Sequence, residues 1–176
     1  QINSFSNFQI KINMFKYEKD QDSIVTVTMD MQGRSANVIN EEFGKLWLDT
    51  IDRLEKEKAE IAGVVLTSAK STFFAGADID NLYKQTDAQL IFDMCEGLKK
   101  QLRRLEILGK PVVAALNGAA LGGGLEIALA CHYRVALNNP KAQFGLPEVG
   151  LGLLPGGGGI VRLTRMIGLQ PALPLL

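Results

Sequence analysis

Cysteine and histidine are scarce in this chain of 176 residues, and their scarcity excludes several kinds of chemistry. The cysteines are Cys95 and Cys131, and the histidine is His132. Two thiols give no disulfide framework, and we expect them to be reduced, as in cytosolic proteins. These residues are also too few for a metal site, so we expect no metal. No serine or cysteine motif accompanies His132, which favours a structural histidine over a catalytic triad.

Net charge is missing too, because 19 basic and 19 acidic residues cancel. A protein that binds nucleic acid would show a basic excess or a basic stripe. Residues 99–104 are locally basic, but apolar residues interrupt them at helical spacing, which favours the solvated face of a helix. We therefore expect no nucleic-acid partner.

No apolar run is long enough to cross a membrane. The apolar stretch at residues 111–125 contains Asn117 and four glycines and ends at Glu126. Residues 1–22 are polar and mixed in charge, so we expect no signal peptide. These features predict a cytoplasmic protein, or a mitochondrial matrix protein if the source is eukaryotic.

The usual phosphate-binding motifs are absent as well. Neither Gly-x-x-x-x-Gly-Lys-Ser/Thr nor the Gly-x-Gly-x-x-Gly spacing occurs, so nucleotide binding fits poorly. Three other glycine-bearing turns are present, at residues 74–78, 121–125 and 154–159. Where such a turn begins a helix, its free N–H groups suit an oxyanion. Tight packing of a helix on a strand would explain a single turn equally well.

Two glutamates lie beside these turns. Glu126 falls in the first turn of an expected helix, within an apolar segment, and Glu148 follows Pro147 in another apolar segment. For Glu126 the alternative is a solvated carboxylate that complements the helix dipole. Burial raises a carboxyl pKa and a helix N-terminus lowers it, so these settings can push two pKa values apart. The sequence thus suggests acid–base chemistry beside an anion-stabilising backbone site.

Strands alternate with helices along the chain, which predicts an α/β fold with a largely parallel sheet. The expected strands are residues 10–17, 24–29, 61–67, 111–116 and 133–137. One helix is expected after Asn40 as its cap, and another after a capping box at residues 86–89. A short helix is expected from the triple glycine through Ala130, and a last one from after Gly159 to near Gly168. The second helix carries an expected apolar stripe of Leu90, Met94, Leu98, Leu102 and Leu105.

Taken together, these motifs resemble the signature of the crotonase, or enoyl-CoA hydratase/isomerase, superfamily. The likeness is strongest in Lys-Pro-Val-Val-Ala-Ala-Leu-Asn-Gly-Ala-Ala-Leu-Gly-Gly-Gly-Leu-Glu at residues 110–126. Residues 73–79, and residues 144–148 with 154–159, look like the other two motifs in the same order. Residues 133–136 and 161–168 resemble the hydratase part of multifunctional fatty-acid oxidation α subunits. In those proteins an NAD-dependent 3-hydroxyacyl-CoA dehydrogenase follows the hydratase.

The resemblance implies an α/β crotonase-like ββα superhelix and assigns roles to the residues above. The N–H groups of Ala77 and Gly123 would form an oxyanion hole for the thioester carbonyl. Glu126 would act as the base toward water, and Glu148 would deliver a proton to Cα. In a Δ3-to-Δ2 isomerisation Glu148 would carry the proton alone. We expect the third glycine turn, at residues 154–159, to shape the helix behind Glu148.

The resemblance also implies contacts with an acyl-CoA substrate. The loop at residues 34–40 resembles the segment whose backbone around Ala36 meets coenzyme A, although a simple strand-to-helix connection is equally open. Helix capping is the favoured role of Asp78. No cofactor is expected for hydration, since coenzyme A is part of the substrate, and NAD would belong to the missing dehydrogenase part. The remaining expected contacts are Ala75, Gly76, Asp78, Ile79, Gly122 and Pro147.

The expected function is therefore hydration of trans-2-enoyl-CoA in fatty-acid β-oxidation, with Δ3-Δ2 isomerisation as a companion activity. Other acyl-CoA chemistry on the same fold, or a non-catalytic acyl-CoA or RNA-binding scaffold, are the alternatives. We expect residues 1–176 to form one domain, an N-terminal fragment of a multifunctional chain without its C-terminal helices. An oligomer, or a complex with a thiolase β subunit, is expected of the full-length protein.

Overall fold

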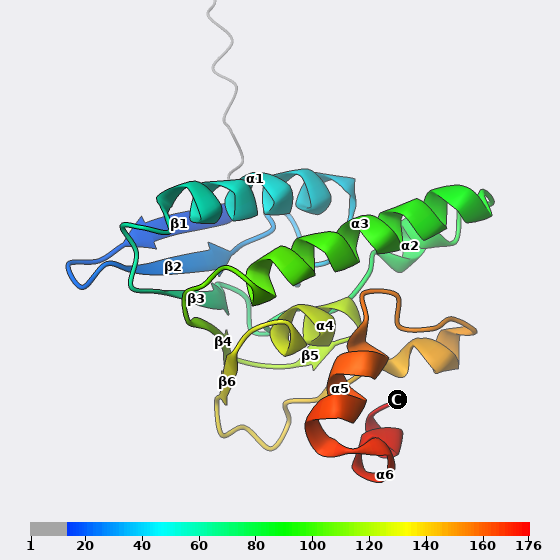
Figure 1. The fold of residues 1–176 in the computed structure, drawn as a ribbon. Helices are drawn as coiled ribbons and strands as arrows, with labels where there is room; N and C mark the ends of the chain where they lie inside the picture. The colour runs from blue at the N-terminus through cyan, green and yellow to red at the C-terminus, as the bar shows by residue number, and fades with distance from the viewer. Residues whose placement is uncertain (1–13) are drawn as a thin grey trace, which may run out of the picture.

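The computed structural model describes residues 14–176, and a mostly parallel sheet forms its centre (Figure 1). Neighbouring strands follow the order β1-β2-β3-β4-β6, in which β1 and β2 are antiparallel and the other pairs are parallel. A small parallel sheet pairs β5 with β7. The expected strand at residues 10–17 overlaps β1, but its first residues lie outside the described ones. The strands are β1 Phe15–Lys19, β2 Ile24–Met29, β3 Gly63–Ser68, β4 Val112–Leu116, β5 Ala120–Leu121, β6 Tyr133–Ala136 and β7 Phe144–Gly145.

The first long helix, α1, spans Glu41–Glu57 and begins as predicted. The Asn40 side chain accepts a hydrogen bond from the Phe43 N–H at 2.8 Å, which satisfies one of the free donors of the first turn. The crossover helices required between parallel strands follow along the chain. They and the shorter helical segments are α2 Ile79–Leu82, α3 Ala88–Glu106, α4 Gly123–Leu129, η1 Pro147–Leu151, α5 Gly159–Ile167, α6 Leu169–Ala172 and η2 Leu173–Leu175.

The capping box predicted for α3 is wrong. Asp87 caps this helix, because its carboxylate accepts the N–H groups of Gln89 and Leu90. The Gln89 side chain bonds Asp93 instead of reaching back. A carboxylate at the cap also complements the helix dipole, which an amide or hydroxyl does not.

The apolar stripe predicted for α3 is buried only toward its C-terminus. Leu102 and Leu105 are buried, whereas Leu90 and Met94 are exposed. The N-terminal half of α3 extends past the sheet (Figure 1), which leaves Leu90, Phe92 and Met94 exposed. Of the basic residues predicted to lie on a solvated helix face, Lys100 and Arg103 are exposed, whereas Lys99 and Arg104 are half-buried. Arg104 pairs with Asp52 and Glu55 of α1, each at 2.6 Å.

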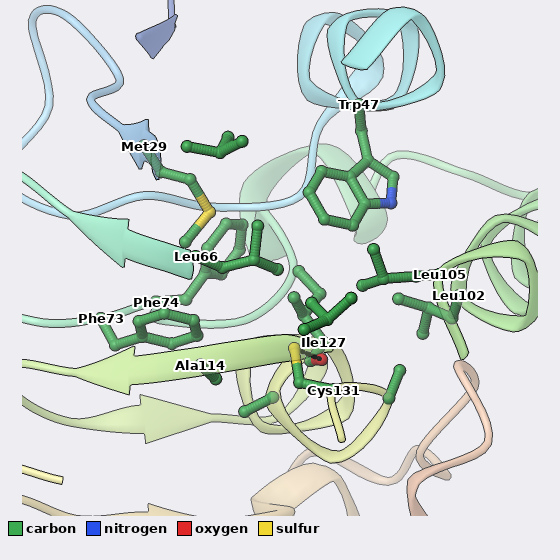
Figure 2. Packing of buried hydrophobic residues seen from close by; sticks show 14 of the residues in the cluster. Met29, Trp47, Leu66, Phe73, Phe74, Leu102, Leu105, Ala114, Ile127 and Cys131 are labelled. Carbon is green, nitrogen blue, oxygen red and sulfur yellow. Dashed lines mark hydrogen bonds between the residues drawn. The ribbon is translucent and has the colours of Figure 1, made fainter. Parts of the chain in front are cut away.

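The hydrophobic core lies between the sheet and the helices packed on it. Figure 2 shows side chains of α1, α3 and α4 converging on the strands. An aromatic cluster joins α1 to the segment after β3, where the ring centroids of Phe43 and Phe74 lie 5.1 Å apart. This packing fixes the chain just before the turn at residues 74–78. The labelled residues are Met29, Trp47, Leu66, Phe73, Phe74, Leu102, Leu105, Ala114, Ile127 and Cys131.

Candidate active site

Glu126 is a buried carboxylate in the first turn of α4, with only 2% of its surface exposed. Its Oε1 accepts a hydrogen bond of 2.8 Å from the Gly159 N–H at the start of α5. Burial raises the pKa of Glu126, although the backbone N–H groups of Gly159 and Gly157 and the positive charges of Arg162 and Lys99 oppose the rise. The prediction that Glu126 faces the core is confirmed.

Glu148 is half-buried at the start of η1, next to Pro147. Its Oε2 is buried without a hydrogen-bond partner among the described residues. Burial raises the pKa of this carboxyl, and the negative charge of Glu126 raises it further, against a lowering by its own backbone N–H. The sequence suggested opposite effects on the two pKa values, but burial raises both. What differs is that cations offset the rise at Glu126 and not at Glu148.

The two amides predicted to form an anion site are both free to donate. Within residues 14–176, neither the Ala77 nor the Gly123 N–H has a hydrogen-bond acceptor. At Ala77 the backbone groups on either side bond Ile39, at 2.8 Å through Gly76 O and at 2.9 Å through the Asp78 N–H. This pairing turns the Ala77 N–H away from Ile39. Gly123 is the first residue of α4, where an N–H has no partner within the helix.

Close approach of two glycine turns brings these amides together. Gly76 has a φ of +103°, and a methyl group there would lie 3.2 Å from Leu121 O and 3.8 Å from the Gly123 N. A methyl group on Gly122, where φ is +52°, would lie 3.0 Å from Glu148 Oε1. One on Gly123 would lie 4.0 Å from Glu126 Oε2. The Gly122–Gly123 backbone is therefore close to both carboxylates, and at Gly122 the positive φ and the nearness of Glu148 favour glycine.

The third glycine turn begins α5, as predicted, but the carboxylate that it contacts is Glu126, whereas the prediction placed it behind Glu148. A methyl group on Gly157 would lie 2.6 Å from Glu126 Oε2, and one on Gly159 would lie 2.8 Å from Glu126 Cγ. The physical reason is that α5 begins at Gly159 and directs its free N–H groups at the buried carboxylate.

The other predicted substrate contacts surround this centre. Ala75 is exposed, and its N–H donates to Asn37 O at 2.9 Å. Ala36 lines a polar hollow of about 420 Å³ together with Arg34, Ser35 and Asp80. Ile79 is exposed and lines a smaller groove, of about 190 Å³, whose other walls include Leu82, Tyr83, Leu151 and Leu153.

Asp78 has the structural role that was favoured for it. The carboxylate is buried, caps α2 by accepting from the Asn81 N–H, and pairs with Arg34 at 2.7 Å. His132 is also structural. Its Nδ1 accepts from the Val112 N–H at 3.0 Å, and its Nε2 lies 3.1 Å from Glu106 O. These contacts tie the start of β4 to the end of α3.

Both cysteines are free thiols, and burial raises the pKa of Cys131 to about 12. Among residues 14–176 no cluster of histidine, cysteine, aspartate and glutamate side chains could hold a metal ion. Over the same range no helix has the length and apolar character to span a bilayer.

Sequence reasoning missed two residues that hold the backbone around the site, Arg162 and Asn37. Arg162, near the N-terminus of α5, donates from Nη1 to Gly157 O at 2.6 Å and from Nε to Glu106 Oε1 at 2.5 Å. A signal was present, since the helix dipole disfavours a cation at that end unless a specific partner holds it. Asn37 was missed because its buried hydrogen bonds join segments that are far apart in the sequence.

Known proteins resemble this chain in both sequence and structure. The Shewanella halifaxensis protein named fatty acid oxidation complex subunit alpha is 45% identical over 166 residues, which cover 92% of this chain and 23% of that protein. The Aliivibrio fischeri protein of the same name is 40% identical over 163 residues, covering 92% of this chain and 24% of its own length. The chain therefore spans about a quarter of the length of these relatives.

Solved structures of enoyl-CoA hydratases have a similar fold. The enoyl-CoA hydratase from Bacillus anthracis has a TM-score of 0.83 at 31% identity, over 92% of this chain and 61% of that one. A Geobacillus kaustophilus structure, described as enoyl-CoA hydrates, has a TM-score of 0.84 at 32% identity, over 92% of this chain and 60% of that one. This likeness confirms the predicted crotonase-like fold. The sequence model for enoyl-CoA hydratase/isomerase matches residues 19–175, and the chain belongs to that family.

Proposed function

We propose that this chain hydrates trans-2-enoyl-CoA thioesters to 3-hydroxyacyl-CoA, with Glu126 and Glu148 as its acid–base pair. The observation that supports this most directly is that a buried carboxylate, Glu126, and a half-buried one, Glu148, both lie close to the Gly122–Gly123 backbone. Addition of water to a double bond needs one group to take a proton and another to give one. The two carboxylates can fill these two roles. The free N–H donors beside them can stabilise the negative charge that develops on the substrate.

The surroundings of the carboxylates support different protonation states. Glu126 accepts a backbone hydrogen bond and feels two cations, which favour its ionised form. Glu148 has an unpartnered buried oxygen and feels the charge of Glu126, which favours its protonated form. Glu126 therefore takes a proton from water as the water oxygen bonds Cβ. Glu148 gives its proton to Cα, and the two carboxyls then exchange protons with solvent to reset.

Between these two steps the thioester oxygen carries the negative charge. The N–H groups of Ala77 and Gly123 are free to donate to that oxygen. A donor aimed at a developing oxyanion contributes about 2.7–4 kcal/mol of transition-state stabilisation. Both donors lie on backbone fixed by other hydrogen bonds, so little reorganisation is needed when the charge forms.

The two hollows beside the site suit the two ends of an acyl-CoA. The polar hollow at Ala36 carries Arg34 and Ser35, which match the phosphates and polar groups of coenzyme A. The groove at Ile79 is walled by aliphatic and aromatic side chains and suits an acyl chain. Ala75, Gly76, Asp78, Gly122 and Pro147 would also contact the substrate, since they are next in sequence to the proposed oxyanion donors and carboxylates.

The test follows the loss of the conjugated enoyl absorbance when the purified protein meets a short trans-2-enoyl-CoA. We expect Glu126→Gln and Glu148→Gln each to lower kcat by roughly 10²–10⁴-fold, as general acid–base catalysis predicts. Glu42→Gln, at an exposed position in α1, is the matched control and should leave kcat unchanged. Unchanged rates in both active-site variants would contradict the mechanism. An inactive wild type that still binds acyl-CoA would favour a non-catalytic scaffold.

Three finer proposals accompany this function. Glu148 alone would carry the proton in a Δ3-to-Δ2 isomerisation, which its unpartnered oxygen supports. A longer protein that contains this chain would add an NAD-dependent 3-hydroxyacyl-CoA dehydrogenase and assemble with a thiolase β subunit in the cytoplasm. The α-subunit relatives are named as parts of a fatty acid oxidation complex, which supports assembly into a complex of that kind. Residues 1–176 would serve as its hydratase domain.

A further inference from the structure

Arg162 connects three elements close to Glu126 without contacting that carboxylate. From α5, its Nε donates to Glu106 Oε1 at the end of α3, at 2.5 Å. Its Nη1 donates to Gly157 O at 2.6 Å. The two side chains are mostly buried, with 16% of Arg162 and 23% of Glu106 exposed. A planar guanidinium can hold two such partners in fixed directions.

The carbonyl that Arg162 holds belongs to the turn that supports the base. Gly157 and Gly159 both approach Glu126, and the Gly159 N–H donates to its Oε1 at 2.8 Å. Gly158, between them, has a φ of +91°, and a methyl group there would lie 2.7 Å from Arg162 Nη1. The turn is thus confined on one side by the carboxylate and on the other by the guanidinium.

We propose that Arg162 is a positioning residue for Glu126, acting through the turn Gly157–Gly159, and that Glu106 holds Arg162 in place. This inference rests on the proposed function, in which Glu126 is the base. Loss of the guanidinium frees the Gly157 carbonyl, and the N–H groups beyond it lose their aim at the carboxylate. A displacement of about 1 Å at a catalytic group can cost roughly 100-fold in rate.

Arg162 also acts on the charge of Glu126. Four titratable groups face this carboxylate: Cys95 and Lys99 from α3, Arg162 from α5, and Glu148 from η1. The Arg162 cation opposes the rise in the pKa of Glu126 that burial causes. Without it that pKa rises further, so the base is protonated over a wider acidic range. The acidic limb of the rate profile therefore shifts to higher pH.

The experiment compares Arg162→Gln and Arg162→Lys with Arg165→Gln, which removes an exposed charge from the same helix. For Arg162→Gln we expect kcat to fall roughly 10- to 100-fold with little change in KM, and the acidic limb to move upward. Arg162→Lys keeps the positive charge, so it should return the acidic limb of the rate profile to its wild-type pH. It should recover kcat only in part, because an ammonium cannot hold two partners in fixed directions as a guanidinium does. Arg165→Gln should match wild type. Rates are normalised to the folded fraction from circular dichroism.

Glu106→Gln tests the second half of the proposal. It should lower kcat in the same direction, and the double variant with Arg162→Gln should be no worse than Arg162→Gln alone. NMR titration of ¹³C-labelled glutamate carboxyls gives the pKa of Glu126 without any turnover. An inactive wild type would end the proposed function, while this titration would still decide the role of Arg162. A Glu126 titration identical in wild type and Arg162→Gln, with kcat falling only as stability falls, would overturn the proposal.

Discussion

At the scale of the residue, Glu126 and Glu148 differ in what compensates their burial. Glu126 has a hydrogen bond from Gly159 and two nearby cations, so its negative charge is supported. Glu148 leaves one oxygen buried without a partner in the described chain, and a second negative charge lies close by. A buried charge without partners costs stability, and active sites retain such groups because the chemistry needs them.

Replacing Glu148 with glutamine should therefore stabilise the fold near neutral pH while it removes activity. A raised folded-state pKa means that the folded protein binds the proton more tightly than the unfolded chain. The cost of ionised Glu148 is absent below the ordinary carboxyl pKa of about 4.3 and grows as pH rises through the raised pKa. We expect Glu148→Gln to gain about 1 kcal/mol in the free energy of unfolding at pH 7, and little at pH 4.

Urea denaturation of wild type and Glu148→Gln from pH 4 to pH 8 measures this difference. Glu42→Gln, at an exposed carboxylate, should show a difference near zero at every pH. A gain for Glu148→Gln that is equal at pH 4 and pH 7 would show that its charge is not the cause.

At the scale of the element, the third glycine turn is shaped by the helix beneath it. Methyl groups on Gly156, Gly157 and Gly158 would lie 2.7, 3.2 and 4.0 Å from the side chains of Cys95, Leu98 and Lys99 respectively. The residues on α3 follow the spacing of one helix face. The turn thus packs directly on α3 on one side and against Glu126 on the other. Larger side chains in the turn would collide with one or the other, so glycine is required there.

This element also marks the limit of what the sequence predicts. Strands β2, β3, β4 and β6, the Asn40 cap and the short helix at residues 123–129 were predictable, because each depends on neighbouring residues. The two-residue strands β5 and β7 were not predicted. The turn was predicted as a glycine turn but assigned to the wrong glutamate. Its partner is decided by contact with α3, about 60 residues earlier in the chain, and no local pattern carries that information.

Gly157→Ala tests how the close packing of this turn against Glu126 affects activity, apart from any effect of backbone conformation. The new methyl group would lie 2.6 Å from Glu126 Oε2 and 2.9 Å from its Cδ, so the carboxylate must move. We expect kcat to fall roughly 100-fold with KM nearly unchanged. Enoyl hydration assays and a thermal melt give both quantities.

Gly150→Ala is the matched control, since a methyl group there meets no atom within 4 Å. It lies in η1, beside Glu148, and should keep wild-type rates. Equal activity of the two alanine variants would contradict the role given to Gly157.

At the scale of the whole molecule, Asn37 joins the ends of separate strands beneath the oxyanion site. Its Oδ1 accepts from the Met31 N–H at 2.9 Å. Its Nδ2 lies within hydrogen-bond distance of Met29 O, Ser68 Oγ and Phe73 O. Its own carbonyl accepts from the Ala75 N–H, two residues before Ala77. One buried side chain therefore fixes the segment that carries a predicted oxyanion donor.

Asn37→Ala should destabilise the protein and weaken the site together. The substitution leaves several buried polar groups without partners, and each costs about 1–3 kcal/mol, although relaxation recovers part of that. We expect a loss of about 2–4 kcal/mol in the free energy of unfolding, measured by urea denaturation. The folded fraction should also hydrate more slowly, because the backbone from Ala75 to Ala77 is less constrained. Asn138→Ala, at an exposed position after β6, should lose less than about 0.5 kcal/mol. If the two variants lost equal stability, the Asn37 side chain would have no special role, and the backbone bonds of residues 37 and 39 would be enough to hold the oxyanion segment.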